Sequence, residues 1–339
     1  MILVTGVTGL VGAHLLFKLL QDEDNVVAIY KSDKSRQKTK KIFSYYSSDY
    51  ENIFSKIIWK EADITDIDSL LDVFVGITEV FHCAGYVNFD PSAKDTVMAI
   101  NHLGTANIVN VCLEKSVEVL HYISSIAAIG TDANGELITE EIEWQISKTN
   151  SVYSISKYHA EMEVFRGVAE GLKVTIVNPG LIIGPGEWHS SSLILFHTVW
   201  NGMKFYSNGI NGYVDVRDVV GCMLQLRKNN IYNQKFIVVS ENISYRDLFN
   251  YMSAAMGKKP PYIKITPFMT QVKWRLEKIK SFFTGQSPII TKDSIKSVFV
   301  ETLYSNKKIV EAIDYKFVPI ERSISETTVH FLNDIKSQL

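Results

Sequence analysis

A tyrosine and a lysine stand four residues apart in the stretch "YSISK", Tyr153 to Lys157, where their chemistry could serve proton transfer. Side chains at this spacing lie one turn apart on the same face of a helix. A free tyrosine has a pKa of about 10 and is a poor base at neutral pH, but a nearby lysine ammonium favours the phenolate and lowers that pKa. Taken alone, the pair favours a half-buried core tyrosine and a surface lysine.

A glycine-rich loop, "TGVTGLVG" (5–12), lies between a short β-branched run and a helical pattern. Its first glycine allows a tight turn, its second lets the backbone approach a pyrophosphate, and its third lets the helix pack closely on the strand. The phosphates would sit at the helix N-terminus, where free N–H groups and the helix dipole favour anions. The alternative is a plain strand-to-helix turn. The predicted dinucleotide-binding residues of this loop are Gly6, Gly9, Leu10, Val11 and Gly12.

The residues after the second predicted strand favour NADP over NAD. An NAD site would offer Asp or Glu to the ribose about 20 residues after the loop. Here Lys31 occupies that position, with Lys34 and Arg36 close behind. A cation there could pair with the 2′-phosphate of NADP. Two alternatives stay open: a solvated basic loop that continues through "KTKK" (38–41), or an NAD site served by Asp33.

Strand and helix patterns alternate over residues 1–180, and the strands are short, apolar and β-branched, as in sheets covered on both faces. This alternation predicts an α/β fold of the Rossmann type, a doubly wound parallel sheet. The predicted strands are 1–5, 25–30, 56–66, 79–85, 118–125 and 173–180, and the predicted helices are 9–20, 67–75, 96–115 and 151–170.

The predicted organisation is a Rossmann domain over 1–180, to which 212–240 returns, and a smaller lobe for the substrate. The lobe comprises 181–211 and 241–339 and is expected to be mostly helical.

Composition excludes several classes of protein. A hydrophobic content of 46% and a charged content of 21% fit a globular protein, and a net charge of −2 offers no basic field for nucleic acid. Cys83, Cys112 and Cys222 lie far apart, which predicts no metal site and a reducing, cytoplasmic location.

Membrane association is not expected. We see no secretory signal and no stretch near the roughly 18 apolar residues of a membrane span. The basic amphipathic segment 267–283 could touch a membrane surface, but an ordinary half-buried helix or a dimer face is the more common explanation.

Several further motifs follow in an order that resembles the extended short-chain dehydrogenases/reductases, the NAD-dependent epimerase/dehydratase family. They are "ADITD" (62–66), "HCAG" (82–85), Asn101 in "INHLGTANIV", "YISS" (122–125), "YSISK" and "NPGLIIGPG" (178–186). Residues 304–332 are similar to the C-terminal end of the dihydroflavonol-4-reductase and 3β-hydroxysteroid-dehydrogenase branch.

The resemblance implies roles for individual residues. Ser125, Tyr153 and Lys157 would be the catalytic group, and Asn101 would support the central helix. The resemblance also implies a homodimer formed through helices 96–115 and 151–170. The implied cofactor contacts outside the glycine loop are Asp63 and Ile64 at the adenine, Ala84 and Gly85 at the ribose, Tyr153, Lys157, and Pro179 at the nicotinamide.

Two departures from the family pattern reduce the number of reactions that this protein is expected to catalyse. Asn178 precedes Pro179 where nucleotide-sugar enzymes often have arginine, and Ile126, not an acid, follows Ser125. Without an acid–base pair there, elimination of water lacks its proton carriers. We therefore predict an oxidoreductase that uses NADP, or alternatively NAD, and transfers hydride to or from a ketone, aldehyde or secondary alcohol.

Two other functions stay open: a nucleotide-sugar epimerase with tightly bound NAD, and a dinucleotide-binding protein without catalysis. The segments 86–95, 186–196 and 204–209 are expected to line the substrate pocket. Their aromatic and hydroxyl side chains, with few cations, favour a moderately apolar small molecule.

Overall fold

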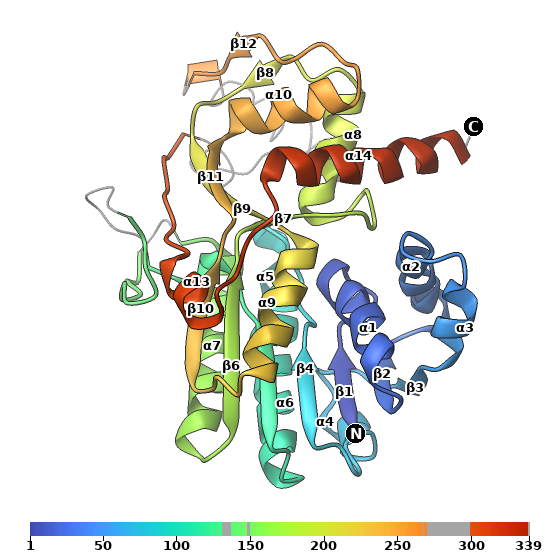
Figure 1. Cartoon of the computed structure of the whole chain (residues 1–339). Coiled ribbons are helices and arrows are strands. Elements are labelled where there is room, and N and C mark those ends of the chain that lie inside the picture. Colours follow the sequence, from blue (N-terminus) through green and yellow to red (C-terminus); the bar gives the residue numbers. More distant parts are fainter. Residues whose placement is uncertain (131–136, 148–149, 267, 270–298, 338–339) are drawn as a thin grey trace.

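The computed structural model describes residues 1–130, 137–147, 150–266, 268–269 and 299–337 (Figure 1). The predicted amphipathic segment 267–283 lies outside the described residues except for Phe268 and Met269.

Seven strands form one sheet in which every neighbouring pair is parallel. This arrangement confirms the predicted doubly wound α/β fold. The strands, in sheet order, are β10 (Gln234–Val238), β6 (Lys173–Pro179), β5 (Val119–Ile123), β4 (Glu79–His82), β1 (Ile2–Thr5), β2 (Val26–Tyr30) and β3 (Ile58–Glu61).

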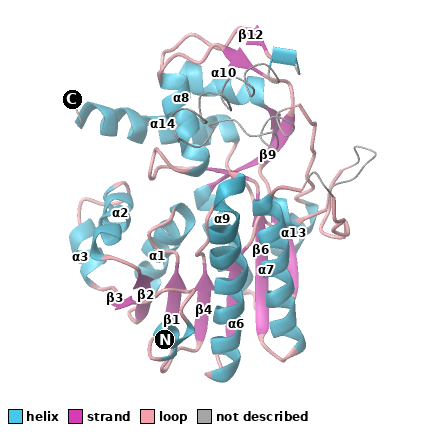
Figure 2. Ribbon diagram, turned by 180° about the vertical axis from the view of Figure 1, so that it is seen from behind, coloured by secondary structure: helices cyan, strands magenta, loops and turns pink. Residues whose placement is uncertain are grey.

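Helices cover both faces of this sheet (Figures 1 and 2). Successive residues of a strand point to opposite faces, so Ile2 and Val4 enter one hydrophobic core and Leu3 enters the other. The first core is closed by α1 (Leu10–Asp22), α9 (Val216–Lys228) and α13 (Lys307–Ile313), and the second by α4 (Ile67–Leu71), α6 (Gly104–Glu114) and α7 (Val152–Ala169).

The basic segment after β2 is a helix and not a solvated loop, which corrects that alternative. Residues Asp33–Ser44 form α2, and Tyr50–Ser55 form the short α3. Thr39, Ile42 and Phe43 are buried on one side of α2, while its lysines lie on the other side or at its margin. The buried Thr39 hydroxyl donates to the carbonyl of Val7 at 2.9 Å and so ties α2 to the glycine loop.

The smaller lobe lies above the carboxyl edge of the large sheet (Figure 1). Its core packs Trp188, Phe196, Met252 and Phe331 together. It contains two small sheets as well as the expected helices. Its elements are β7 (Leu181–Ile183), α8 (Ile194–Trp200), β8 (Phe205–Tyr206), β9 (Ile210–Asp215), β11 (Glu241–Ser244), α10 (Tyr245–Ala255), β12 (Ile263–Lys264) and α14 (Ile320–Ser337).

The segment 212–240 is divided between the two parts. β9 pairs with β7 and β11 in the lobe, whereas α9 packs on α1 and β10 pairs with β6 in the large sheet.

One long helical run, Lys94–Glu114, joins α5 (Lys94–Met98) and α6 through a π-helical turn at Ala99–Leu103. Among the described residues, this run is long and apolar enough to cross a membrane by length and composition alone, which the sequence analysis did not expect. It also packs against α7, and its Ile108 and Val109 belong to the second core.

The two edge strands of the large sheet differ in what lies along their outer edges. On β10, the Ile237 N–H donates to the Glu140 carboxylate at 2.7 Å, and the Lys308 ammonium donates to the Lys235 carbonyl at 2.9 Å. On the opposite edge, β3 has only four residues, all at least partly exposed.

A cluster of charged side chains joins α9, β4 and β5 at the amino edge of the sheet. Arg227 on α9 donates two hydrogen bonds of 2.8 Å to Glu79 on β4 and one of 2.8 Å to Glu23. His121 on β5 lies 2.9 Å from the same Glu79 carboxylate. Burial raises the pKa of Glu79, but the hydrogen bonds from His121 and Arg227 outweigh it and lower this pKa to about 2.

We predict that Glu79→Gln destabilises the fold by on the order of 3 kcal/mol at pH 7. A carboxylate whose pKa is depressed in the folded state stabilises above its unfolded pKa of about 4.3 and loses this contribution as pH falls toward its folded pKa. The difference in unfolding free energy from wild type should therefore shrink below about pH 4.3, measured by urea denaturation. Glu114→Gln, at an exposed carboxylate, serves as control. A difference that does not change with pH would contradict this assignment.

Candidate active site

The site residues gather at the carboxyl edge of the large sheet. β1 pairs with β2 on one side and with β4 on the other, so the order of the strands reverses between β1 and β4. Ligands of open parallel sheets bind outside the strand ends at such a reversal. The glycine loop follows β1, and Ser125 follows β5 at the same edge.

The glycine loop has the geometry that a pyrophosphate needs. Gly6 has φ of +67°, a left-handed conformation that favours glycine. A Cβ on Gly12 would lie 2.3 Å from the Gly6 carbonyl oxygen, so no larger residue fits there without a shift. Gly9 caps α1 without a side-chain hydrogen bond, which leaves the first N–H groups of Leu10 and Val11 without a side-chain cap. The loop therefore fits a dinucleotide.

The predicted adenine and phosphate residues meet at the ends of β2 and β3. The Lys31 ammonium lies 2.5 Å from the Asp63 carboxylate, which also accepts hydrogen bonds from the N–H and hydroxyl of Thr65 at 3.0 and 2.9 Å. Burial raises the pKa of Asp63, but the contacts with Lys31 and Thr65 give a net lowering. Ile64 is buried next to Asp63, and its carbonyl accepts from Asn107 at 2.9 Å.

A second cation lies beside this pair. The Arg36 guanidinium packs 5.2 Å from the Tyr30 ring centre and 5.1 Å from that of Trp59. It also donates to Asp33 at 2.9 Å. Asp33, the alternative ribose ligand, is thus paired with Arg36.

The predicted ribose residues follow β4. The Ala84 N–H donates to the buried Thr5 hydroxyl at 3.1 Å, which fixes the end of β4 against β1. A Cβ on Gly85 would lie 3.5 Å from the Asn101 side-chain oxygen and 4.0 Å from the Lys157 ammonium. Asn101 lies in the π-helical turn and exchanges hydrogen bonds with the backbone of Tyr86 at 2.7 and 3.0 Å.

The three predicted catalytic residues lie together. The Ser125 hydroxyl accepts from the Ala127 N–H at 3.1 Å, and Ser125 lies close enough to Tyr153 to lower its pKa. Lys157, 4% exposed, donates to the Tyr122 hydroxyl at 2.7 Å and to the Ile123 carbonyl at 2.9 Å. Ser151 caps α7 through the N–H of Ser154 and so sets the start of the helix that carries Tyr153 and Lys157.

Burial controls the charge states here. It lowers the pKa of Lys157 to about 7, although the charge of Glu161 opposes it. Burial also raises the pKa of Tyr153, and the hydrogen bond with Ser125 only partly offsets this effect. The sequence predicted a lowered pKa for Tyr153. In the protein alone burial raises the pKa, and the Lys157 ammonium is bonded to Tyr122 and the backbone.

Of three further residues near the site, Phe89 lies in the predicted pocket segment 86–95, whereas Tyr122 and Glu161 had no predicted role. Phe89 packs edge to face on Tyr153 with ring centres 5.5 Å apart. Tyr122 binds Lys157, and the fully buried Glu161 lies one turn further along α7. The spacing of four residues from Lys157 could have indicated Glu161, whereas Tyr122 carries no signal beyond a strand pattern. Pro179 is buried at the end of β6, as expected for a residue of this edge.

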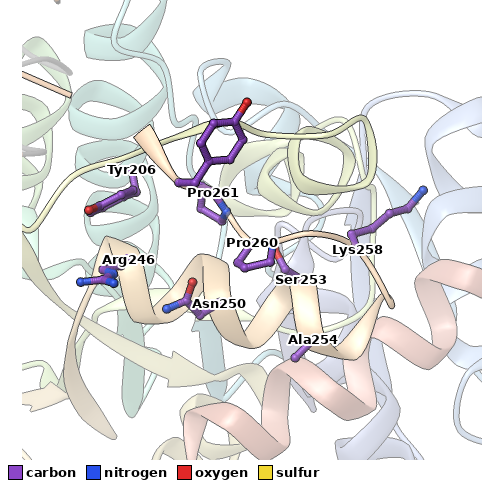
Figure 3. Close-up of a pocket in the computed structure, with 9 residues that line it drawn as sticks. Tyr206, Arg246, Asn250, Ser253, Ala254, Lys258, Pro260 and Pro261 are labelled. Atoms are coloured by element: carbon purple, nitrogen blue, oxygen red, sulfur yellow. The ribbon is translucent and has the colours of Figure 1, made fainter. Parts of the chain in front are cut away.

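A separate cavity of about 490 Å³ lies in the lobe, between α10 and the β8–β12 pair (Figure 3). Tyr206, from the predicted pocket segment 204–209, lies on its wall, with the Arg246 guanidinium 5.1 Å from its ring centre. Lys258 lies at the right of Figure 3, with its ammonium 3.8 Å from the Trp200 ring centre. None of the predicted catalytic or cofactor residues lines this cavity.

Comparison with known proteins agrees with the fold. A model of the NAD dependent epimerase/dehydratase family matches residues 2–238. A putative dihydroflavonol 4-reductase of Synechocystis sp. is 27% identical over 337 residues, 97% of this chain and 94% of that protein. Sterol demethylase protein B of Methylococcus capsulatus is 25% identical over 303 residues, 87% of each protein.

Among solved structures, a UDP-glucose 4-epimerase of Thermotoga maritima shares the fold with a TM-score of 0.74 and 19% identity, over 98% of this chain and 99% of that one. The family match and the similar reductases indicate an oxidoreductase. With a family match across more than half of its length, the chain belongs to the NAD dependent epimerase/dehydratase family.

Proposed function

We propose that this protein is an NADPH-dependent reductase of an apolar, ring-bearing ketone or aldehyde, or runs the reverse oxidation. The observation that carries the proposal is the position of these residues: Ser125 lies close enough to Tyr153 to lower its pKa, and Lys157 is buried one turn further along α7. Two hydroxyls and a nearby cation are the groups that carbonyl reduction requires.

In the proposed reaction, bound NADPH supplies the hydride. Ser125 holds the carbonyl oxygen of the substrate, and Tyr153 donates its phenolic proton to that oxygen while the carbonyl carbon gains hydride. The raised pKa of Tyr153 keeps the phenol protonated at neutral pH, ready to act as the acid. Lys157 stabilises the phenolate that remains and binds the nicotinamide ribose.

The substrate class follows from the side chains around Tyr153. Tyr86, Val87 and Phe89, in the segment that packs on Tyr153 through Phe89, are 38%, 41% and 45% exposed, which are high values for large apolar residues. Phe89 lies against the Tyr153 ring, so a planar ring on the substrate could stack beside it. A similar reductase is named for a dihydroflavonol, itself a ring-bearing ketone.

The cofactor preference rests on cations at the end of β2. Lys31 is 65% exposed and so remains accessible, although Asp63 shares its charge. Arg36, held between Tyr30 and Trp59, adds a second cation from α2. Two cations at this position favour a 2′-phosphate over a bare ribose.

The first test is a panel of aromatic ketones, aromatic aldehydes and a steroid ketone, scored by loss of NADPH absorbance. We expect turnover by wild type and a loss of about 100-fold or more in kcat for Tyr153→Phe, because the phenolic proton is removed. Tyr158→Phe, on the same helix but stacked on Trp144, should retain wild-type activity. Equal activity of wild type and Tyr153→Phe would exclude Tyr153 as the acid.

The second test is cofactor affinity, measured by calorimetry for NADPH and NADH with wild type, Lys31→Ala and the control Lys228→Ala. Lys228 is an exposed lysine at the far end of α9. We expect Lys31→Ala to weaken NADPH binding about tenfold or more, since it removes a charge-assisted bond, and to leave NADH unchanged. Tighter binding of NADH by wild type, or NAD retained through purification, would overturn the NADPH preference and favour an epimerase instead.

A further inference from the structure

A buried carboxylate lies directly behind the proposed catalytic residues. Glu161 follows Tyr153 and Lys157 at successive spacings of four residues, so all three lie along one face of α7. Its side chain is 0% exposed. Removing a carboxylate from water costs several kcal/mol unless partners replace the water, so its contacts indicate what it does.

The described contacts of Glu161 all come from donors or cations. The Ser124 hydroxyl donates to Oε1 at 2.5 Å, and the Asn178 side-chain amide donates to the same oxygen. The Lys235 ammonium lies 3.6 Å from Oε2. Among the described residues, Oε2 accepts no hydrogen bond. Burial raises the pKa of Glu161, while Lys235, Ser124 and Asn178 oppose burial and favour the ionised form.

The same partners fix the position of Ser125. The Asn178 amide that donates to Glu161 also donates to the Ser125 carbonyl at 3.0 Å. The Ser124 N–H donates to the Val177 carbonyl at 2.8 Å. The two serines therefore have different partners: the Ser124 hydroxyl donates to Glu161, and Ser125 lies next to Tyr153 and lowers its pKa.

Glu161 also acts on Lys157, because its charge opposes the lowering of the Lys157 pKa by burial. The groups that face this ammonium from other elements are Tyr122 on β5 and His82 and Cys83 at the end of β4. Burial lowers the pKa of His82 to about 3 and raises the pKa of Cys83 to about 12, so both are neutral at pH 7. Burial likewise raises the pKa of Tyr122.

We propose that Glu161 is a positioning residue of this site, whose carboxylate holds the Ser124–Ser125 strand end and supplies the negative charge that keeps Lys157 protonated. The inference rests on the proposed function of Ser125, Tyr153 and Lys157. It gives a physical role to Asn178, whose amide joins the Glu161 carboxylate to the Ser125 backbone. An arginine at position 178 could not make the same short bridge.

The test compares Glu161→Gln with wild type and with Glu163→Gln. Glu163 lies two residues further along α7, partly exposed, where it pairs with Arg166 at 2.8 Å. Two readouts are measured: the pH profile of kcat/KM with NADPH and a turned-over ketone, and the titration midpoint of Lys157. The midpoint comes from competitive labelling with trace acetic anhydride and mass spectrometry, and needs no turnover.

For Glu161→Gln we expect the Lys157 midpoint to fall by about one pH unit, because a stabilising anion is lost. Protonated Lys157 exists below its midpoint, so the alkaline limb of the profile should move to lower pH by a similar amount. We also expect kcat to fall about tenfold or more at neutral pH. Glu163→Gln should match wild type in every readout.

An unchanged midpoint and an unchanged alkaline limb in folded Glu161→Gln would overturn the inference. If that variant does not fold, Ser124→Ala is measured instead. A lowered kcat with an unchanged Lys157 midpoint would support the positioning role of Glu161. A wild-type kcat would overturn that role. If wild type reduces no carbonyl in the panel, the proposed function fails. The labelling result then still determines whether Glu161 controls the charge of Lys157.

Discussion

Parallel pairing of seven strands is the constraint on which the whole site depends. Each parallel strand needs a crossover before the next, so all the carboxyl ends lie at one edge. The loop after β1, the segment after β4, the serines after β5 and Asn178 near the end of β6 meet there although they are distant in sequence. The helix after β5 then needs only a cap at Ser151 to bring Tyr153 and Lys157 onto this edge.

At that edge, burial and charge oppose each other. Removing water favours the neutral forms of both Lys157 and Tyr153. The charged lysine therefore depends on what surrounds it, and most of its neighbours are neutral at pH 7. A similar balance holds at the ends of β2 and β3, where Asp63 stays ionised because Lys31 and Thr65 compensate its burial. The charge state of Lys157 or of Asp63 therefore cannot be predicted from the type of that residue alone, because it depends on the neighbouring groups.

The sequence predicted what local patterns determine: the strands of the large sheet, the glycine turn, and the helix that carries Tyr153 and Lys157. It did not predict α2, because its many lysines conceal the short buried face of Thr39, Ile42 and Phe43. The two-residue strands β8 and β12 are too short to leave a periodic signal. The pairing of Lys31 with Asp63 depends on which strands are neighbours, and that order is a tertiary property.

The edge strands have a consequence for how copies of this protein meet. An open strand with free N–H and C=O groups is a template on which another chain can add a strand. On β10 the Glu140 carboxylate and the Lys308 ammonium already occupy groups that such a strand would need. On the other side, β3 is short and carries Lys60 and Glu61. Addition of a further strand, and so edge-to-edge growth of the sheet into a fibre, is therefore opposed at both edges.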